Sequence, residues 1–328
     1  YQGAYADSAT KLRTIIQSGQ TKDLPDVMQV DAAGVMSYRT SDNTYSVSQA
    51  MEDYPGFDLE QILDVPLAYW NFDDEQLGLP FSSSTTVLFY NKTLLDEAGF
   101  DKAPTTFEEI IELQEQLPET NEAGDKIYAF AGVPNTPSLA NWIGQIPGED
   151  VDTSYVLDKM NGRAGQASEV IADDEGTLQR FLTAWKAMYD AGALLNEPSG
   201  TTDRFIAGEV AMITNSSSGL GILPQRIDGN FEMGVSFLPR IDEDANFGAT
   251  VSGSGIFMFD RLEGENTEAA WDFVQYLMRP DVQAEFSLVS GYFPAVEDAY
   301  EEEDFIAYTD EHPEFLVPVE QVRETSPD

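Results

Sequence analysis

The sequence predicts an α/β fold in which mainly parallel sheets are flanked by helices. Short apolar segments of strand length alternate along the chain with longer segments whose apolar residues recur at helical spacing. The 328 residues are enough for two domains, and the 42% share of hydrophobic residues allows a large core. No internal repeat and no low-complexity linker interrupts this alternation.

The first predicted helix covers residues 5–18, where apolar side chains recur at helical spacing and Gly19 can cap the end. A short buried strand is expected at residues 27–30, because three of these four side chains are apolar. A turn at residues 31–34 follows the strand. From there to residue 80 the sequence is acidic and less regular, and it predicts no strong element.

The middle of the chain predicts a strand at residues 87–90, followed by a short helix from Asn91 to Gly99. A further helix starts at Thr106, which has capping-box spacing to Glu109. The inner face of this helix is expected to hold Phe107, Ile110, Ile111 and Leu117. The clearest helix is "TLQRFLTAWKAMYDAG", and its predicted buried stripe comprises Leu178, Phe181, Leu182, Trp185 and Met188.

The last third predicts a strand at residues 210–214 and another apolar strand after residue 255. The segment "NTEAAWDFVQYLMRP" reads as an N-capped helix with Phe273, Val274 and Leu277 inside. A final helix is expected to end at Gly291.

The charge of the chain is strongly one-sided, with 59 acidic against 17 basic residues and a net charge of −42. Such a charge repels itself in dilute buffer, whereas molar salt shortens the Debye length to about 3 Å. The composition therefore predicts a protein from a halophile, with an archaeon as the expected source, and an ordinary acidic protein is the alternative. It also excludes nucleic-acid binding, because no basic stripe is present to meet phosphates.

Catalytic and metal-binding motifs are not evident. The chain has no cysteine and a single histidine, His312, which excludes cysteine-type zinc sites and His-rich metal sites. The acidic run from Asp242 to Asp244 suggests a solvated patch, although a cation site is an alternative. No nucleophile elbow or phosphate loop occurs. We therefore expect no enzyme activity, no metal and no cofactor, with an acidic glycoside hydrolase as the alternative.

Three Ser- and Gly-rich segments at strand ends, residues 82–86, 215–219 and 252–255, are expected to form turns. In open α/β sheets the ligand crevice lies off the strand ends, where hydroxyl and backbone N–H groups can bind an oxyanion or sugar hydroxyls. Tyr5 and Tyr292 lie at predicted element ends. The alternative is that Ser and Gly are common in any turn.

Four blocks of the sequence resemble one known family. They are "PFSSSTTVLFYNKTLLDEAGFDKAPTTFEEI", "RFIAGEVAMITNSSSG", "GSGIFMF" and "LMRPDVQAEFSLVSGYFPA". In content and order they are similar to the extracellular solute-binding proteins of ABC importers, in the branch that includes maltose-binding protein. Phe107 replaces the tryptophan usual in the first block. The stretches "YQGAY", "PFSSST" and "SGYFP" are most similar to the members that bind glycerol-3-phosphate.

The resemblance implies a set of ligand contacts. Tyr5 would contact the glycerol end of the ligand. The phosphate would be held by Ser84, Ser216, the backbone N–H of Gly253 and the hydroxyl of Tyr292. Further positions that the resemblance brings near the ligand are Asp31, Thr85, Trp142, Ser217 and Ser252.

Two departures from the family pattern concern the ligand. The family's glutamate for the glycerol hydroxyls aligns with Ala32, one residue after Asp31. The family's phosphate-binding arginine would lie beyond Asp328. The chain is thus expected to lack the family's first strand and last helices. A binding protein for a neutral sugar or oligosaccharide is the alternative, although the chain has only four tryptophans for stacking.

The resemblance also implies a two-lobed fold of the periplasmic-binding-protein type with its ligand cleft at the hinge. Residues 1–84 and 254–300 would form lobe one, residues 86–252 would form lobe two, and residues 301–328 would return towards lobe two. The protein would act as a monomer outside the cell, lipid-anchored, and would deliver a small solute to the membrane permease by hinge closure. A sensing role with a receptor in place of a permease is a further alternative.

Overall fold

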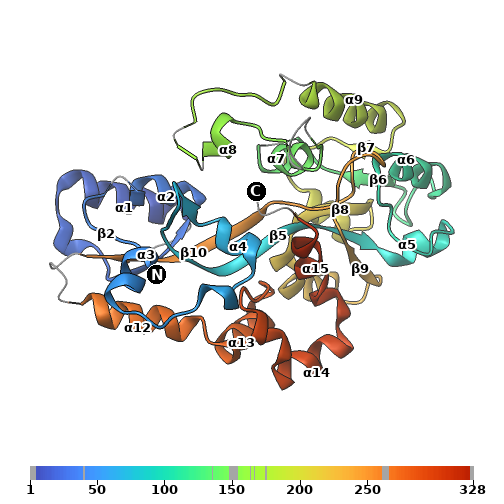
Figure 1. The fold of residues 1–328 in the computed structure, drawn as a ribbon. Coiled ribbons are helices and arrows are strands. Elements are labelled where there is room, and N and C mark those ends of the chain that lie inside the picture. Colours follow the sequence, from blue (N-terminus) through green and yellow to red (C-terminus); the bar gives the residue numbers. More distant parts are fainter. Residues whose placement is uncertain are drawn as a thin grey trace.

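The computed structural model describes residues 5–39, 41–134, 136–147, 154–162, 164–165, 167–173, 176–260 and 266–325. Helices flank a central mixed sheet, and the two long strands β5 and β10 run through the middle of the molecule (Figure 1). None of the helices in these ranges is long and apolar enough to cross a bilayer.

The elements of the described ranges are as follows. The strands are β1 (Val27–Asp31), β2 (Thr44–Tyr45), β3 (Asn71–Phe72), β4 (Glu75–Gln76), β5 (Leu79–Asn91), β6 (Tyr128–Ala131), β7 (Leu194–Leu195), β8 (Val210–Ser216), β9 (Met233–Ser236) and β10 (Val251–Phe259). The α-helices are α1 (Tyr5–Ser18), α2 (Ala32–Arg39), α3 (Val47–Asp53), α4 (Asp64–Ala68), α5 (Lys92–Glu97), α6 (Phe107–Gln116), α7 (Thr136–Gly144), α8 (Asp158–Gly162), α9 (Thr177–Asp190), α10 (Thr201–Ile206), α11 (Leu223–Ile227), α12 (Thr267–Leu277), α13 (Pro280–Ser290), α14 (Glu303–Glu311) and α15 (Val317–Arg323). The 3₁₀-helices are η1 (Thr21–Asp23), η2 (Leu59–Gln61), η3 (Ser217–Gly221), η4 (Glu297–Glu301) and η5 (Pro313–Phe315).

The strand order of the main sheet is β1-β10-β5-β8-β6-β7, with β2 also paired to β10 and β9 to β5. The expectation of mainly parallel pairing is wrong. In the part of the sheet that the structure describes, only β6 pairs in parallel, with β7 and β8. The β5 and β10 ladders are antiparallel. Alternating strands and helices predict parallel pairing only where each helix carries the chain back to the start of the neighbouring strand. In the main sheet, β5 and β10 are instead reached by long connections.

The hydrophobic core is divided along β5. Residues 79–85 of β5 pair with β10, and residues 86–90 pair with β8. Around the first part lie two clusters, one that includes Trp271 on α12 and one that includes Trp70 beside β10. Around the second part lie two others, which include Trp185 on α9 and Phe205 on α10. The sheet therefore joins two packed bodies, and a smaller cluster that includes Val251, Phe293 and Val322 packs α15 against the first of them.

Several elements confirm the sequence predictions in type and position. Helix α1 spans residues 5–18, and Gly19 follows it with a φ of 68°. Asn91 caps α5 through a hydrogen bond from the N–H of Leu94, and Thr106 caps α6 through the N–H of Glu109. On α6, the predicted inner residues Phe107 and Ile110 are buried. The local capping signals thus held for α5 and α6, whereas the side chain of Asn266 makes no capping hydrogen bond at the start of α12, contrary to the N-cap expected there.

Other predictions were wrong. Residues 31–34 do not form an isolated turn, because Asp31 accepts a hydrogen bond from the N–H of Gly34 and α2 starts at Ala32. The acidic region before residue 80 holds α3 and α4. Leu182 on α9 and Phe273 on α12 were expected inside, yet they are 47% and 50% exposed. Each of them is the sequence neighbour of a buried residue, Phe181 or Val274, and lies on the solvent side of its helix.

The hydroxyl-rich segments also differ from expectation. Residues 82–86 lie within β5, and residues 252–255 lie within β10, so neither forms a turn. The third segment crosses from the end of β8 into η3.

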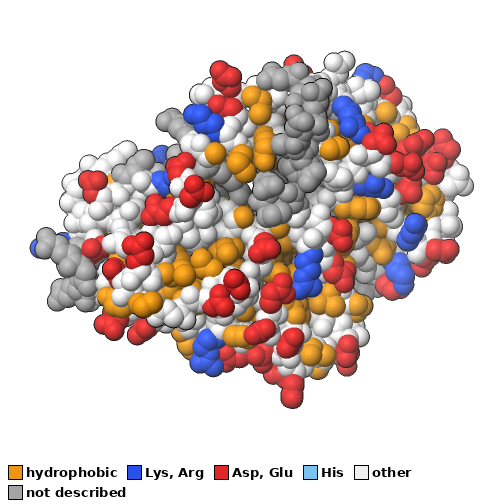
Figure 2. Space-filling model, viewed as in Figure 1, with side chains coloured by type: hydrophobic (Ala, Val, Ile, Leu, Met, Phe, Trp, Pro, Cys, Tyr) orange, Lys and Arg blue, Asp and Glu red, His pale blue; other side chains and the backbone are white. Residues whose placement is uncertain are grey.

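Acidic side chains are spread over the visible face of the molecule and do not gather in one patch (Figure 2).

Candidate functional site

The centre of the candidate site is the contact between β5 and β10. Ser84 lies opposite Ser252, and Ser83 lies opposite Gly253. The side-chain oxygens of Ser84 and Ser252 are 2.9 Å apart and share a hydrogen bond. Ser84 is 3% exposed, whereas Ser252 is partly exposed. Two predicted site residues are therefore in direct contact across neighbouring strands.

Gly253 is required by the close approach of these strands. Its φ is +105°, a value that side chains disfavour, and a Cβ there would lie 1.8 Å from the carbonyl oxygen of Ser82. No other residue fits this backbone. Because glycine has no side chain, the main chain of β10 stays uncovered beside Ser84. A backbone N–H group that donates to a ligand needs such an uncovered position.

Ser216, the last residue of β8, and Ser217, the first residue of η3, approach the same point. Ser216 lies opposite Thr86, two residues along the strand from Ser84. The side-chain oxygen of Ser216 is 2.9 Å from that of Ser218. Ser217 is fully buried, and its hydroxyl accepts a hydrogen bond of 3.2 Å from the N–H of Thr85. Ser216 is partly exposed, whereas the hydroxyl of Ser217 is occupied by the main chain of β5.

Tyr292 enters from the segment after α13. The N–H of its neighbour Phe293 donates to the carbonyl of Ser83 at 3.0 Å, which places Tyr292 beside the centre of β5. Its ring is stacked parallel to Phe286 at 6.0 Å, and Phe286 stacks on Phe81 of β5 at 4.5 Å. The aromatic stack therefore fixes the ring on the same strand that carries Ser84.

The remaining predicted residues divide as follows. Thr85 is fully buried, and its hydroxyl donates to the carbonyl of Thr250. Asp31 lies opposite Ser254, two residues from Ser252, and it caps α2. Tyr5 is the first residue of α1, and its side chain lies outside the described part of the structure.

The prediction that Trp142 lines the cleft is wrong. Trp142 is 1% exposed, and its indole N–H donates to the carbonyl of Pro239 at 3.0 Å. Its ring stacks on Phe181 and touches Trp185 in the core beside β6. Its neighbour Asn141 faces the strands instead, so the motif "ANWIG" contributes its amide and not its indole.

Three amides that the sequence did not single out hold the site together. Gln29 of β1 donates to Ser82 and Ser254 at 2.7 and 2.6 Å. Asn141 of α7 donates to Thr86 at 2.9 Å and accepts from the N–H and the hydroxyl of Thr250. Gln321 of α15 donates to the hydroxyl of Thr85 and to the carbonyl of Thr86. No local pattern marks these residues, because their partners are distant in sequence.

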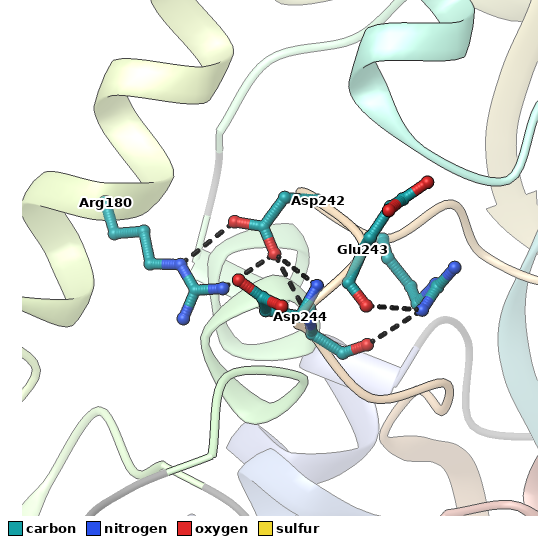
Figure 3. A network of polar contacts seen from close by, with 6 residues as sticks. Arg180, Asp242, Glu243 and Asp244 are labelled. Atoms are coloured by element: carbon teal, nitrogen blue, oxygen red, sulfur yellow. Dashed lines mark hydrogen bonds and ion pairs between the residues drawn. The ribbon is translucent and has the colours of Figure 1, made fainter.

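The acidic run near Asp242 is a structural turn. Asp242 accepts hydrogen bonds from both ends of the Arg180 guanidinium and from the N–H groups of Asp244 and Ala245 (Figure 3). Partial burial raises the pKa of this carboxyl, but Arg180 and the two N–H groups lower it more, so that its pKa is below the ordinary value. Within the described ranges no group of three acidic or histidine side chains could hold a metal ion.

The chemistry that this arrangement offers is hydrogen bonding by neutral groups. The hydroxyls of Ser84, Ser216 and Ser252 bond to other hydroxyls and to backbone atoms. A hydroxyl both donates and accepts, so such a cluster can serve either an oxyanion or a polyol.

Comparison with known proteins identifies the family. A model of bacterial extracellular solute-binding proteins matches residues 1–313. The chain is 24% identical over 310 residues to a protein of Yersinia pestis named as the sn-glycerol-3-phosphate-binding periplasmic protein UgpB, covering 92% of this chain and 67% of that protein. It is 25% identical to the protein of that name from Brucella abortus, covering 100% of this chain and 74% of that protein.

Solved structures show the same fold. UgpB of Mycobacterium tuberculosis in complex with glycerophosphocholine superposes with a TM-score of 0.77 at 19% identity, covering 99% of this chain and 78% of that one. The maltose-bound MalE3 of T. maritima superposes with a TM-score of 0.70 at 19% identity, covering 97% of this chain and 78% of that one. These proteins are two-lobed, which agrees with the two packed bodies joined by β5 and β10.

Proposed function

Since the chain belongs to the bacterial extracellular solute-binding proteins, the substrate-binding components of ABC importers, we propose that its solute is glycerol-3-phosphate or a related glycerophosphodiester. The observation that carries this proposal is the convergence of hydroxyl groups from β5, β8 and β10 beside Gly253 and Tyr292. The names of the Yersinia and Brucella relatives support the same ligand.

In this proposal Ser84, Ser216, the N–H of Gly253 and the hydroxyl of Tyr292 hold the phosphate, and Tyr5 contacts the glycerol end. Asp31, Thr85, Ser217 and Ser252 support these groups from neighbouring positions. The donors are neutral, so they bind the phosphate through directed hydrogen bonds. Relatives that bind solutes support a role without catalysis.

The lobes follow from the same reasoning. Residues 1–84 and 254–300 form lobe one, residues 86–252 form lobe two, and residues 301–328 return towards lobe two. Gln321 supports the last assignment for α15, because its side chain accepts from the N–H of Leu238 at 2.6 Å, whereas Phe305 of α14 packs in the cluster of lobe one that includes Trp271. A ligand that contacts both lobes favours the closed form, which the permease then recognises. The protein works as a monomer at the outer surface of a halophile, held by a lipid anchor.

A neutral sugar or polyol is the second candidate. The observation in its favour is the neutral character of the hydroxyl cluster, which suits a polyol as well as an oxyanion. Burial of all four tryptophans at 6% exposure or less speaks against a long oligosaccharide, because such ligands are held by exposed stacking rings.

Isothermal calorimetry in 2 M KCl separates these candidates. Glycerol-3-phosphate, glycerophosphocholine, glycerol, ribitol and maltose are titrated into the same protein. We expect micromolar binding, about −8 kcal/mol, for the phosphate esters and none for glycerol. Binding of ribitol or maltose alone would support the second candidate and contradict the phosphate assignment.

A further inference from the structure

Two pairs of serine hydroxyls lie at the candidate site. Ser84 of β5 and Ser252 of β10 share a hydrogen bond in which their oxygens are 2.9 Å apart. Ser216, at the end of β8, and Ser218, in η3, share a second bond of 2.9 Å. In both bonds either hydroxyl can be the donor, because each hydroxyl carries one proton and two lone pairs. The direction of each bond therefore decides which serine has a proton left for a ligand.

Two neighbouring hydroxyls are bonded in a different way. The hydroxyl of Thr85 donates to the carbonyl of Thr250 and accepts from the amide of Gln321. The hydroxyl of Ser217 accepts from the N–H of Thr85. A main-chain or amide partner has a fixed role as donor or acceptor, so each of these bonds has one direction. Of the hydroxyls named here, a ligand can set the direction of the bond only in the two serine pairs.

The surroundings of Ser216 favour one direction. Its N–H donates to the side chain of Asn215 at 2.8 Å, so the hydroxyl is the donor that remains for a ligand. The N–H of Ser218 donates weakly to the Ser216 side-chain oxygen, at 3.4 Å. When the Ser218 hydroxyl donates as well, two donors face this oxygen. The proton of Ser216 is then directed away from Ser218 and is free to bond to a ligand.

The pair of Ser84 and Ser252 has the same two possible directions. When the Ser252 hydroxyl donates to Ser84, the proton of Ser84 is free to bond to a ligand. In the reverse direction, the acceptor that β5 offers to the Ser252 proton is the carbonyl of Ser84, at 3.4 Å. This distance is longer than that of an ordinary O–H···O bond. The first direction is therefore the one that serves a ligand beside Ser84.

A phosphate selects this direction in both pairs. The oxygens of a phosphate dianion accept hydrogen bonds and donate none, so Ser84 and Ser216 must each turn a proton towards it. The oxygen of each of these serines then accepts from the second serine, and a hydroxyl that accepts a hydrogen bond becomes a stronger donor. From this geometry we infer that Ser252 and Ser218 are positioning residues. Each orients the hydroxyl of its partner, Ser84 or Ser216, as a donor to the phosphate.

The inference rests on the proposed function, in which the hydroxyls of Ser84 and Ser216 hold the phosphate. It adds a source of selectivity to that function. A polyol hydroxyl donates as well as accepts, so it can bind to a serine pair in either direction. The same holds for the P–O–H group of a phosphate monoanion. Ser252 and Ser218 therefore favour the dianion of a phosphate monoester, which takes up its second proton near pH 6.

A double-mutant cycle tests whether Ser252 acts through Ser84. Calorimetry in 2 M KCl measures the Kd for glycerol-3-phosphate in the wild type, Ser252→Ala, Ser84→Ala and the double variant. We expect Ser252→Ala to raise the Kd about fivefold, as the loss of one ordinary hydrogen bond does. The double variant should match Ser84→Ala, because no hydroxyl is left to orient. Ser218→Ala should behave in the same way towards Ser216→Ala.

Conservative variants and a matched control accompany the cycle. Ser252→Thr and Ser218→Thr keep the hydroxyl and should stay within about twofold of the wild-type Kd. Ser48→Ala is the matched control. Ser48 of α3 is partly exposed, and its hydroxyl accepts a bond of 2.9 Å from the N–H of Gln76. Loss of this bond should leave the Kd unchanged.

Titrations at pH 5 and pH 8 give a readout that a purely structural role would not change. The wild type should bind glycerol-3-phosphate more weakly at pH 5, because the monoanion brings a proton that two oriented donors cannot accept. The ratio of the two Kd values should be smaller in Ser252→Ala and Ser218→Ala, since Ser84 or Ser216 can then accept that proton. The effect of the other carboxyl groups is common to all variants and cancels in the comparison.

Three results would count against the inference. A loss from Ser252→Ala that persists in full in the Ser84→Ala background would show that Ser252 contacts the ligand itself, and it would overturn the positioning role. Unchanged Kd values in both Ser252→Ala and Ser218→Ala would overturn it as well. A wild-type protein that binds neither glycerol-3-phosphate nor inorganic phosphate would contradict the proposed function, and the inference with it.

Discussion

Gly253 passes so close to Ser82 that a Cβ at position 253 would lie 1.8 Å from the Ser82 carbonyl oxygen. The two strands that carry the candidate site therefore meet at a distance that only glycine allows. This contact joins the packing of the fold to the chemistry of the site.

The first prediction concerns this contact. Gly253→Ala should lower the free energy of unfolding by at least about 3 kcal/mol, because a strained φ is added to a backbone collision. Urea denaturation in 2 M KCl measures the change. The control is Gly19→Ala, where φ is also positive at 68° but no atom lies within 4 Å. It should cost about 1 kcal/mol. Equal losses in the two variants would refute the close-approach argument.

The second prediction concerns Ser84. Ser84→Ala should raise the Kd for the bound phosphate ester about tenfold, since one hydrogen bond to a charged group is lost. Calorimetry provides the measurement. Ser83→Ala is the matched control, because side chains alternate along β5 and residue 83 points to the opposite face. An affinity that Ser84→Ala leaves intact would remove Ser84 from the site.

The third prediction concerns the pH dependence of the Arg180–Asp242 pair. The pKa of Asp242 is lowered in the folded protein, so the pair stabilises the fold above the ordinary carboxyl pKa. That stability is lost as the pH falls through the lowered pKa. With both side chains about a third or more exposed, Asp242→Asn should cost only about 1 kcal/mol at pH 7.

Denaturation of wild type and Asp242→Asn from pH 7 to pH 2 tests this sign. The difference between them should shrink as the pH falls below about 4, because the protonated carboxyl then resembles the amide. Asp190→Asn, which breaks the exposed pair with Lys186 on α9, is the control and should change stability by about 0.3 kcal/mol. A difference that grows on acidification would contradict the assignment.

The fourth prediction concerns salt. With a net charge of −42 and acids spread over the face shown in Figure 2, the melting temperature should rise steadily between 0.1 and 2 M KCl, where the Debye length falls from about 10 Å to about 2–3 Å. Calorimetric melting measures this rise. Trimethylamine N-oxide at equal osmolality adds no ions and separates screening from general exclusion. A melting temperature that is independent of KCl would show that charge repulsion does not limit the stability of the fold.

Much of the fold was predictable because its signals are local. Asn91 and Thr106 each cap a helix by bonds within four residues, and Phe181, Trp185 and Met188 mark the buried face of α9 by their spacing. Leu182 is adjacent to that stripe and hydrophobic, but it faces solvent. Spacing alone cannot say how much of a helix surface its neighbours cover.

The site was predictable in part. The Ser- and Gly-rich segments mark three of the strands that meet there, and the register places Ser84, Ser216 and Gly253 close together. The prediction that these segments form turns was wrong for residues 82–86. A run of hydroxyl residues is also compatible with a buried strand whose hydroxyls bond across the sheet. Asn141 and Gln321 could not be found from sequence, since their partners lie 55 and more residues away.

Capture of a solute between two lobes is the central claim, and small-angle X-ray scattering tests it most directly. The radius of gyration of the wild-type protein is measured in 2 M KCl with and without glycerol-3-phosphate at a concentration that calorimetry shows to be saturating. We predict a smaller radius in the presence of the ligand. An unchanged radius at full occupancy would contradict closure of the lobes around Ser84, Ser252 and Gly253.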